Sequence, residues 1–306
     1  MEKPIVLLTG AAGQLGKTIK GLWSQSGLAD RYELHPVSRK QLDITSASDV
    51  AATLSKLNPA VVINCSAYTA VDKAESDQKN AYLVNEKGPE NLAISCAHSS
   101  ASLIHISTDF VFSGTFDKPI TLTQLANPAG VYGASKRAGE LAIMAQPGRA
   151  VILRTSWLYS PFNANFVKTM LRLMSERESL GVVADQRGAP TSTLSLALAI
   201  FKVIDKPEVD GIYHWSDAAD ISWYDFAVAI QDSAVAAGLL NKAIPISPIK
   251  TSDYPTPAAR PSYSVLDCSQ TEADLGFQQF DWRTQLDQVV QKLKEVEARS
   301  EEIGSV

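Results

Sequence analysis

Residues 4–16 read Pro-Ile-Val-Leu-Leu-Thr-Gly-Ala-Ala-Gly-Gln-Leu-Gly, and this stretch decides the fold. Its first six residues form an apolar, β-rich run that ends at Gly10 and predicts a buried strand, whereas Gln14–Trp23 predicts a helix. Glycines between a strand and a helix permit a tight turn and close backbone approach, and the helix end offers N–H donors and a positive dipole. The stretch therefore favours a dinucleotide pyrophosphate site over an ordinary glycine-rich turn.

The rest of the first half continues this alternation of strand-like runs and helical stretches. Further strands are expected at residues 32–37, 60–64, 102–106 and 150–153, and helices at 47–57, 80–98 and 134–144. Such alternation is typical of α/β proteins in which helices cover both faces of a parallel sheet. The sequence thus predicts a Rossmann-type, doubly wound parallel sheet.

The second half is less regular and predicts a smaller, mixed α/β C-terminal domain. Helices are expected at 165–177, 193–204 and 222–238, strands at 180–183 and 211–215, and a rigid proline-rich loop at 245–261. We expect an NAD(P)-binding Rossmann domain at 1–156, with later returns near 180–184 and 193–216. Residues 157–306 are then expected to be mainly a discontinuous substrate-binding domain.

Composition narrows the class of protein. The chain has 306 residues, 45% of them hydrophobic, and a net charge of −5, which argues against a nucleic-acid or anionic membrane partner. No apolar run is long enough to span a bilayer, and the N-terminus enters a strand without a signal peptide. Three dispersed cysteines and four scattered histidines lack metal spacing. We therefore expect a cytoplasmic protein with reduced cysteines and no structural metal.

A tyrosine and a lysine stand four residues apart in Tyr132-Gly-Ala-Ser-Lys136, within a run that predicts a helix. Positions i and i+4 share a helix face, with Cβ atoms about 5–6 Å apart. A lysine cation beside a phenol lowers the tyrosine pKa from its reference near 10, which would make Tyr132 a proton donor or acceptor usable near neutral pH. The alternative is a solvated lysine beside a half-buried tyrosine.

Polar segments follow two expected strands, at the edge where doubly wound sheets bind ligands. Cys65-Ser66-Ala67 follows the strand at 60–64, and Ser107-Thr108-Asp109 follows the strand at 102–106.

The second strand predicts the cofactor. It ends in Ser38-Arg39-Lys40, and no acid follows until Asp43. An acid at this point binds the ribose 2′-hydroxyl of NAD, whereas a nearby arginine accommodates a 2′-phosphate. The pattern favours NADPH, with NADH possible, although Arg39 and Lys40 could simply be exposed loop charges.

These motifs together resemble the extended short-chain dehydrogenase/reductases. Within that group, several segments are similar to the family of dTDP-4-dehydrorhamnose reductases, and the resemblance runs from residue 5 to about 267. The segments are residues 62–75, 105–112, 153–159, 165–167, 185–191 and 254–261.

The resemblance implies an enzyme that reduces the C4 keto group of dTDP-4-dehydro-β-L-rhamnose to dTDP-L-rhamnose with NADPH, in dTDP-rhamnose biosynthesis. One alternative is a related nucleotide-sugar 4-ketoreductase that makes a 6-deoxytalose or an N-acetylated deoxysugar. Another is a non-catalytic, NADP-binding regulatory subunit, which need not keep the Thr108, Tyr132 and Lys136 set. A homodimer is possible.

The resemblance also implies residue roles. Tyr132 would protonate the C4 oxygen, Lys136 would lower the pKa of Tyr132 and bind the nicotinamide ribose, and Thr108 would hydrogen-bond the reacting oxygen. The cofactor would contact Gly10, Gly13, Gln14, Leu15, Gly16, Arg39, Asp43, Ile44, Cys65, Ser66, Ala67 and Ile106, together with Tyr132 and Lys136. The substrate would contact Thr108, Asp109, Trp157 and Arg260.

Several of these residues have a structural alternative. Asp109 could cap the turn after its strand, Trp157 could be packing between domains, and Arg260 could be a surface charge. Asp72 and Glu75 resemble a catalytic carboxylate pair, but we interpret both as the solvated first turn of a helix. Residues 121–128 contain no acid where relatives carry an acidic pair before the proline, which leaves the exact 6-deoxyhexose open.

Overall fold

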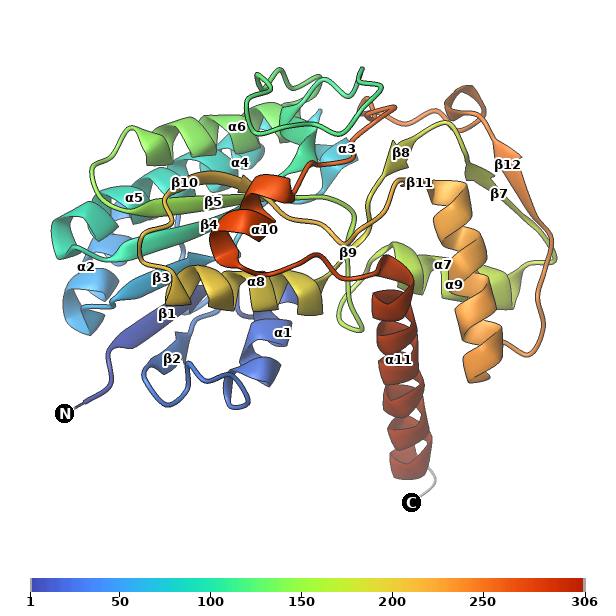
Figure 1. Cartoon of the computed structure of the whole chain (residues 1–306), viewed down its shortest axis with the longest axis horizontal. Coiled ribbons are helices and arrows are strands. Elements are labelled where there is room, and N and C mark those ends of the chain that lie inside the picture. The colour runs from blue at the N-terminus through green and yellow to red at the C-terminus, as the bar shows by residue number, and fades with distance from the viewer. Residues whose placement is uncertain (1, 305–306) are drawn as a thin grey trace.

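A six-stranded sheet, parallel throughout, forms the centre of the computed structural model, which describes residues 2–304, with side chains through residue 296 (Figure 1). The strand order is β10-β5-β4-β3-β1-β2. The strands are β1 (Ile5–Thr9), β2 (Glu33–Pro36), β3 (Val61–Asn64), β4 (Ser102–Thr108), β5 (Ala150–Thr155) and β10 (Gly211–His214). This sheet confirms the Rossmann-type α/β prediction.

The direction of the chain across the sheet reverses between β1 and β3. From β1 the chain passes to β2 at one edge, and it then crosses back to β3 on the other side of β1. Such a reversal opens a crevice at the carboxyl ends of the strands, where doubly wound proteins bind their ligands.

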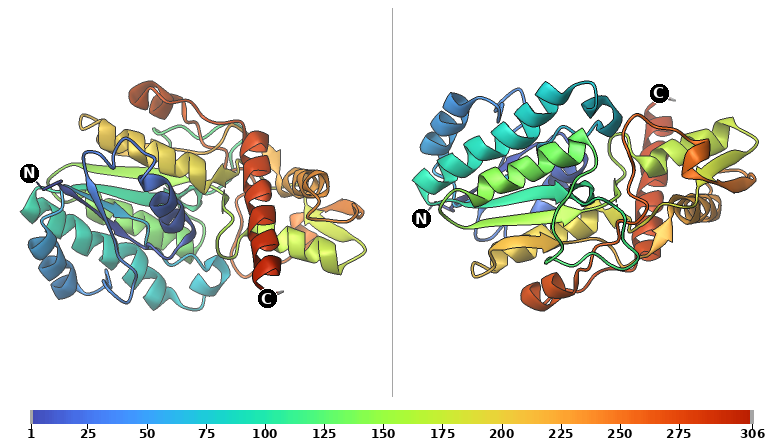
Figure 2. Two further views of the ribbon diagram at one scale, coloured as in Figure 1. Left: turned by 90° about the horizontal axis from the view of Figure 1, so that it is seen from below. Right: turned by 90° about the horizontal axis from the view of Figure 1, so that it is seen from above.

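Helices cover both faces of the sheet, as Figures 1 and 2 show. On one face, α1 (Gln14–Trp23) and α8 (Thr193–Asp205) pack on alternate strand residues such as Val6 and Leu8. On the other face, α2 (Ala47–Leu57), α5 (Gly88–Ser99) and α6 (Val131–Met144) pack around the intervening residues, for example Leu7. Side chains of a strand point alternately to opposite faces, so both faces of each strand must be apolar.

The helix expected at 80–98 is interrupted. It consists of α4 (Gln78–Tyr82), a π-helical turn η1 (Leu83–Lys87) and α5 (Gly88–Ser99). The buried side chain of Asn85 accepts from the backbone N–H of Tyr68 at 2.8 Å and donates to its carbonyl at 3.0 Å. Its backbone also packs on Gly139 of α6, where a Cβ would lie 2.0 Å from the Asn85 carbonyl oxygen. The π turn therefore fastens the segment after β3 to α6.

The second half of the chain builds a separate apolar core. It is formed by α7 (Phe166–Glu176), α9 (Trp223–Ala237), α11 (Trp282–Gly304) and the strand β7 (Leu180–Val183). A small mixed α/β second half was expected. We expected the segment 180–184 to return to the Rossmann domain, but it pairs with β12 (Ile246–Ile249) in this core.

The strand β12 (Ile246–Ile249) lies inside the proline-rich segment 245–261, which we predicted to be a loop. That prediction was wrong for these four residues. Pro248 fits because β12 pairs with β7 alone, so a residue without an N–H can face away from the partner strand.

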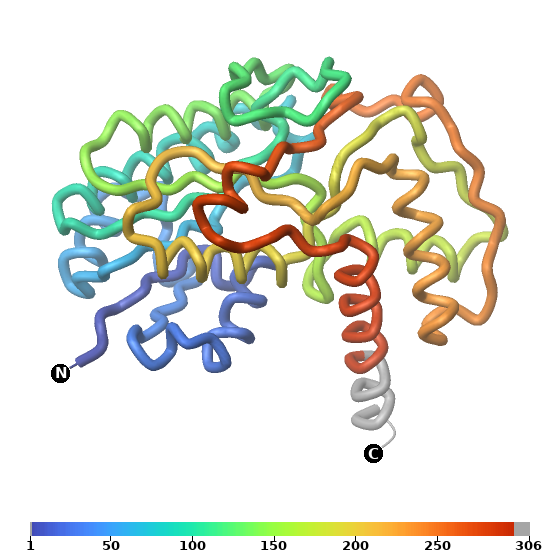
Figure 3. The backbone as a smooth tube through the Cα atoms, viewed as in Figure 1, coloured from blue at the N-terminus to red at the C-terminus, as the bar shows by residue number. Residues whose placement is uncertain are grey.

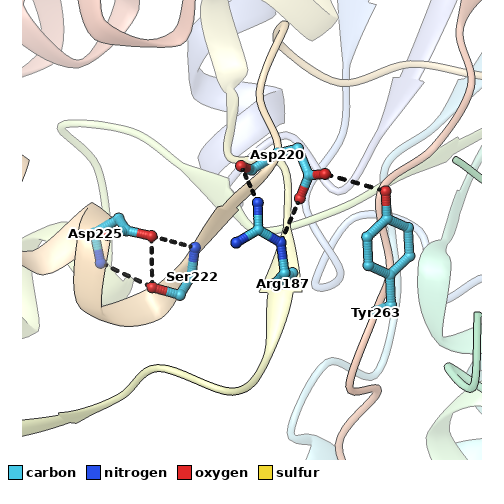
Figure 4. Close-up of polar contacts among 5 residues, drawn as sticks. All are labelled: Arg187, Asp220, Ser222, Asp225 and Tyr263. Atoms are coloured by element: carbon cyan, nitrogen blue, oxygen red, sulfur yellow. Dashed lines mark hydrogen bonds and ion pairs between the residues drawn. The ribbon is translucent and has the colours of Figure 1, made fainter. Parts of the chain in front are cut away.

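Short elements connect the two halves. Strands β6 (Leu158–Tyr159) and β9 (Thr191–Ser192) pair with each other, as do β8 (Arg187–Gly188) and β11 (Ile221–Ser222). Arg187 donates to the Asp220 carboxylate at 2.9 Å, and Tyr263 donates to the same carboxylate at 3.2 Å. Both contacts are drawn in Figure 4. Beside them, Ser222 and Asp225 form a capping box that starts α9.

The C-terminal part of the chain returns to the sheet before it ends. After β12, the tube in Figure 3 passes back to α10 (Ser269–Leu275), which contacts α8 and β10, and then turns into α11. Ile120 and Leu266 form an isolated parallel bridge along this path. Residues 1, 305 and 306, at the outer limits of the two expected domains, lie outside the described residues. Among the described helices, none is long and apolar enough to cross a membrane.

Candidate functional site

Two adjoining cavities follow the carboxyl ends of the sheet strands. The larger has a volume of about 500 Å³ and the smaller about 290 Å³, and both are lined by Gly13, Cys65 and Ala67. Every site residue predicted from the sequence, apart from Arg260, lines one or both cavities. The larger cavity holds Gln14, Leu15, Gly16, Ile106, Thr108, Asp109, Tyr132, Lys136 and Trp157, and the smaller holds Gly10, Arg39, Asp43, Ile44 and Ser66.

The glycine loop lets the backbone approach a ligand closely. Gly10 has φ +68°, a conformation that favours glycine, and a Cβ there would lie 2.6 Å from the Cys65 carbonyl carbon. A Cβ on Gly16 would lie 2.4 Å from the Gly10 carbonyl oxygen. Gly13 begins α1 without a side-chain cap, so the N–H groups of the first turn face the crevice free of a capping side chain. This cradle fits a dinucleotide pyrophosphate.

The smaller cavity places a cation beside an acid whose oxygens are already engaged. Asp43 accepts from the backbone N–H and the hydroxyl of Thr45, and the backbone bond is the main reason that the pKa of Asp43 is lowered. The Arg39 side chain is 78% exposed and lies 3.7 Å from the Asp43 carboxylate. Arg39 can therefore move to a phosphate at this end of the crevice at little cost.

Tyr132 and Lys136 lie on the first turns of α6, as expected, but the expected lowering of the Tyr132 pKa was wrong for this structure. Burial raises the pKa of Tyr132 to about 12, while the nearby Thr108 hydroxyl opposes the rise. The physical reason is the place of Lys136 Nζ, which lies 3.1 Å from His105 Nε2 and 2.6 Å from the Ile106 carbonyl oxygen. The phenol thus keeps its proton at neutral pH.

Lys136 is 2% exposed, and its environment was not visible in the sequence. Burial lowers the pKa of Lys136 to about 8, and the charges of Glu140 and Cys65 oppose this shift. Glu140 is itself fully buried one turn further along α6, where it accepts from Ser107, Arg137 and Arg154.

The segment after β4 places a buried carboxylate in the wall of the larger cavity. Asp109 Oδ1 accepts from the Thr108 hydroxyl at 2.9 Å. Asp109 Oδ2 is buried with no partner in hydrogen-bond geometry among the described residues. Burial raises the pKa of Asp109 to about 6, although the Ser264 side chain lies close enough to oppose this rise. The turn is capped by Thr108, whose side chain accepts from the Phe110 N–H, so Asp109 is not the cap.

Trp157 both lines the cavity and packs against the second core. Its backbone has φ +47°, and its ring stacks on Trp223 with centroids 3.5 Å apart and planes 10° apart. A Cβ on Gly188 would lie 2.6 Å from Trp157 Cε2, so the ring occupies the space that this glycine leaves.

Arg260 lies outside both cavities. Its guanidinium donates to the Asp72 carboxylate at 2.7 Å and to the Ala258 carbonyl at 3.1 Å. Asp72 was interpreted as solvated, yet this ion pair and a bond from the Ala258 N–H engage it. Glu75 likewise accepts from the Val131 N–H at 2.9 Å. Both acids therefore fasten α3 (Val71–Ala74) to neighbouring segments.

A loop that the sequence did not single out lies across the start of α1. Gln14 Oε1 accepts from the Ser160 hydroxyl at 2.7 Å and from Asn165 Nδ2 at 3.0 Å. Asn163 accepts from Lys17 at 2.8 Å and donates to the Ala12 carbonyl. Of these side chains, Gln14, Asn163 and Asn165 line the larger cavity near the glycine loop. Their pairing with α1 depends on contacts across about 150 residues, which no local pattern indicates.

The glycine cradle, the crevice at the strand ends and the tyrosine and lysine of α6 define a dinucleotide-binding oxidoreductase of the Rossmann type. No group of three or more His, Cys, Asp or Glu residues within the described part of the chain could hold a metal ion.

Comparisons with known proteins narrow the class. The chain belongs to the dTDP-4-dehydrorhamnose reductase family: the family profile described as RmlD substrate binding domain matches residues 4–295. The dTDP-4-dehydrorhamnose reductase of Aggregatibacter actinomycetemcomitans is 40% identical over 286 residues, 92% of this chain and 96% of the relative.

Two solved structures of dTDP-4-dehydrorhamnose reductases are similar to this chain along nearly its whole length. A dTDP-4-dehydrorhamnose reductase from Clostridium acetobutylicum has a TM-score of 0.88 at 39% identity, covering 95% of this chain and 99% of its own. The enzyme of the same name from Bacillus anthracis, in complex with NADP, has a TM-score of 0.87 at 37% identity, covering 94% and 98%.

Proposed function

We propose that this chain is the NADPH-dependent reductase of the C4 keto group of dTDP-4-dehydro-β-L-rhamnose, giving dTDP-L-rhamnose in dTDP-rhamnose biosynthesis. The observation that carries the proposal is that Thr108, Tyr132 and Lys136 line one cavity that is continuous with the glycine cradle. Curated relatives at 36–40% identity over most of the chain carry this enzyme's name, and a solved relative holds NADP.

The cofactor lies along the crevice in this proposal. The N–H groups at the start of α1, with Gly10, Gly13 and Gly16, bind the pyrophosphate, and Gln14 and Leu15 line it. Arg39 binds the 2′-phosphate, while Asp43 and Ile44 contact the adenosine end. Cys65, Ser66, Ala67 and Ile106 line the cofactor between the two ends. When bound, the reduced nicotinamide supplies the hydride.

The protein's own residues supply the proton and hold the sugar. Tyr132, protonated at neutral pH because burial raises its pKa to about 12, is the acid that donates its hydroxyl proton to the C4 oxygen. The Thr108 hydroxyl orients that oxygen once its hydrogen turns away from Asp109 Oδ1, to which it donates at 2.9 Å in this structure. Asp109 Oδ2, buried and unpaired within the described structure, accepts a hydrogen bond from a sugar hydroxyl, which relieves the cost of leaving this atom without a partner.

Trp157 already lines the substrate cavity, whereas Arg260 is held outside it. Trp157 offers a ring edge to the sugar nucleotide from its stack on Trp223. Arg260 reaches the substrate diphosphate only by giving up its 2.7 Å bond to Asp72, so its role depends on the proline-rich loop moving when substrate binds.

NADPH oxidation at 340 nm with dTDP-4-dehydrorhamnose tests the proposal, and a panel of related 4-keto-sugars and NADH serves as the comparison. We expect turnover with the rhamnose precursor and a preference for NADPH. Faster turnover of another keto-sugar would favour the sister 4-ketoreductase. NADPH binding without oxidation of any panel member would favour the regulatory subunit.

Three coarser expectations belong to the same proposal: a cytoplasmic location, a homodimer, and division into a cofactor part and a substrate part. The cofactor part comprises about residues 1–156 with the later return at 193–216, and the substrate part comprises mainly the rest of 157–306. Light scattering after size-exclusion chromatography tests the dimer. Limited proteolysis with and without NADPH tests the division, because cofactor binding should protect mainly the first part.

A further inference from the structure

A buried chain of hydrogen bonds connects the surface of the cofactor crevice with Lys136. The Ser66 hydroxyl donates to Thr9 Oγ1 at 3.1 Å, and Thr9 donates to Asn64 Oδ1 at 2.8 Å. Asn64 Nδ2 lies 3.0 Å from His105 Nδ1, and His105 Nε2 lies 3.1 Å from Lys136 Nζ. Thr9, Asn64, His105 and Lys136 are each at most 2% exposed, so these bonds have no competing water.

The orientation of the Asn64 amide is fixed by a backbone donor. The N–H of Ser66 points at Asn64 Oδ1 from 3.0 Å, and a backbone N–H can only donate. Turning the amide over would place its NH₂ group against this N–H and lose the bond from Thr9. Asn64 therefore presents Nδ2 to His105, and His105 Nδ1 must accept.

The ring of His105 is neutral. Burial is the main reason that the pKa of His105 lies well below its usual value. A neutral imidazole carries one N–H, and because Nδ1 accepts from Asn64 that hydrogen lies on Nε2. The N–H of His105 is therefore directed at Lys136 Nζ.

An ammonium group has three donors and no acceptor, so it cannot face this N–H. A neutral amine can accept from His105 and still donate to the Ile106 carbonyl at 2.6 Å. We propose that Asn64 and His105 are positioning residues that hold Lys136 as a neutral amine in the cofactor-free enzyme. Lys136 takes up a proton only when Nζ leaves His105. This inference rests on the proposed function, in which Lys136 binds the nicotinamide ribose of the cofactor.

The groups around Lys136 determine how far its pKa is lowered. Glu140 acts on Lys136 from its own helix, Cys65 from the end of β3, and His105 from β4. Arg154 of β5 is paired to Glu140, which reduces the stabilisation that this carboxylate gives to an ammonium. The His105 N–H acts in the same direction as burial, which lowers the pKa of Lys136 to about 8.

Nitrogen-15 NMR of the cofactor-free wild-type enzyme, labelled in histidine, tests the tautomer directly. The signal of His105 is assigned by its loss in His105→Gln. We expect a neutral ring protonated on Nε2 between pH 6 and 8. A ring protonated on Nδ1, or an imidazolium, would overturn the proposal. This measurement needs no substrate, so its outcome is independent of whether the enzyme reduces the proposed sugar.

The titration of Lys136 provides the second test, followed through carbon-13 at its Cε and assigned with Lys136→Met. His105→Leu removes the N–H, so the titration midpoint should rise by about one pH unit, a tenfold change in proton affinity. A midpoint that falls would mean that Nε2 accepts from an ammonium, and would refute the proposal.

Two further variants separate this effect from general damage to the fold. His105→Gln keeps an acceptor for Asn64 and an N–H for Lys136, so its midpoint should stay near that of the wild type. Asn64→Asp turns the donor at His105 Nδ1 into an acceptor and should move the ring proton to Nδ1. If His105 keeps its proton on Nε2 in a folded Asn64→Asp variant, Asn64 does not set the tautomer and the proposal is refuted.

Discussion

The buried carboxylate of Glu140 offers the sharpest test of what holds the catalytic helix in place. Its two oxygens accept from Arg154 Nε at 2.8 Å and Nη2 at 2.7 Å, from Arg137 at 2.7 Å and from Ser107 at 2.6 Å. Glu140→Gln keeps the shape but places an NH₂ group opposite two guanidinium donors. Because Arg154 is only 3% exposed, the variant leaves an underpaired buried cation.

Breaking one partner of such a pair costs about 3–5 kcal/mol of unfolding free energy. At roughly 2 °C per kcal/mol for a chain of this size, the melting temperature should fall by about 6–10 °C. The exposed pair of Arg172 with Glu176 is the matched control, and Glu176→Gln should change stability by less than about 0.5 kcal/mol. Chemical denaturation monitored by tryptophan fluorescence measures both variants.

The pH dependence of the stability difference between wild type and Glu140→Gln provides a second test. Burial raises the pKa of Glu140, but the bonds and charges of Arg154, with Ser107 and Arg137, outweigh it and hold the pKa below its usual value. A lowered folded-state pKa contributes stability that is present above the unfolded pKa, near 4.3, and is lost as pH falls through the folded pKa. The gap between wild type and Glu140→Gln should therefore be full at pH 7 and close below about pH 4. A gap under 1 kcal/mol at pH 7, or one that widens in acid, would refute the reasoning.

Three further outcomes are expected. Tyr132→Phe should lower kcat by about 10²–10⁴-fold while leaving the NADPH Kd nearly unchanged, and a variant that keeps most of its kcat would remove Tyr132 as the proton donor. Gly188→Ala should raise the substrate KM more than the NADPH Kd, because its Cβ lies 2.6 Å from Trp157, whereas Gly21→Ala, with open space around it, should have no effect on either. Arg39→Ala should lower kcat/KM for NADPH and spare NADH, and an equal loss with both cofactors would move Arg39 to the class of surface charges.

Local patterns predicted the first half of the fold well because its elements carry their own signals. The bounds of α1 and α2 agree with the sequence prediction, since each has a regular apolar stripe and a recognisable start. The sequence missed the π turn at Leu83–Lys87 because its cause is the backbone of Tyr68, which binds Asn85 from another segment. It missed β12 because the prolines of that segment suggest a loop, and only pairing with β7 makes the segment a strand.

In the candidate site, too, the features with a local sequence signal were predicted and those that depend on distant segments were not. The spacing of Tyr132 and Lys136 correctly placed both on one helix face, because helix periodicity is a local property. The charge of Lys136 is not local: it depends on His105, which is 31 residues away, and on an amide in β3 that only the sheet brings within reach. A lysine that points at a neutral imidazole N–H has a different proton affinity from one that points at a phenol. Sequence spacing therefore identifies which residues meet, while the hydrogen-bond donors and acceptors around them determine the protonation state in which they meet.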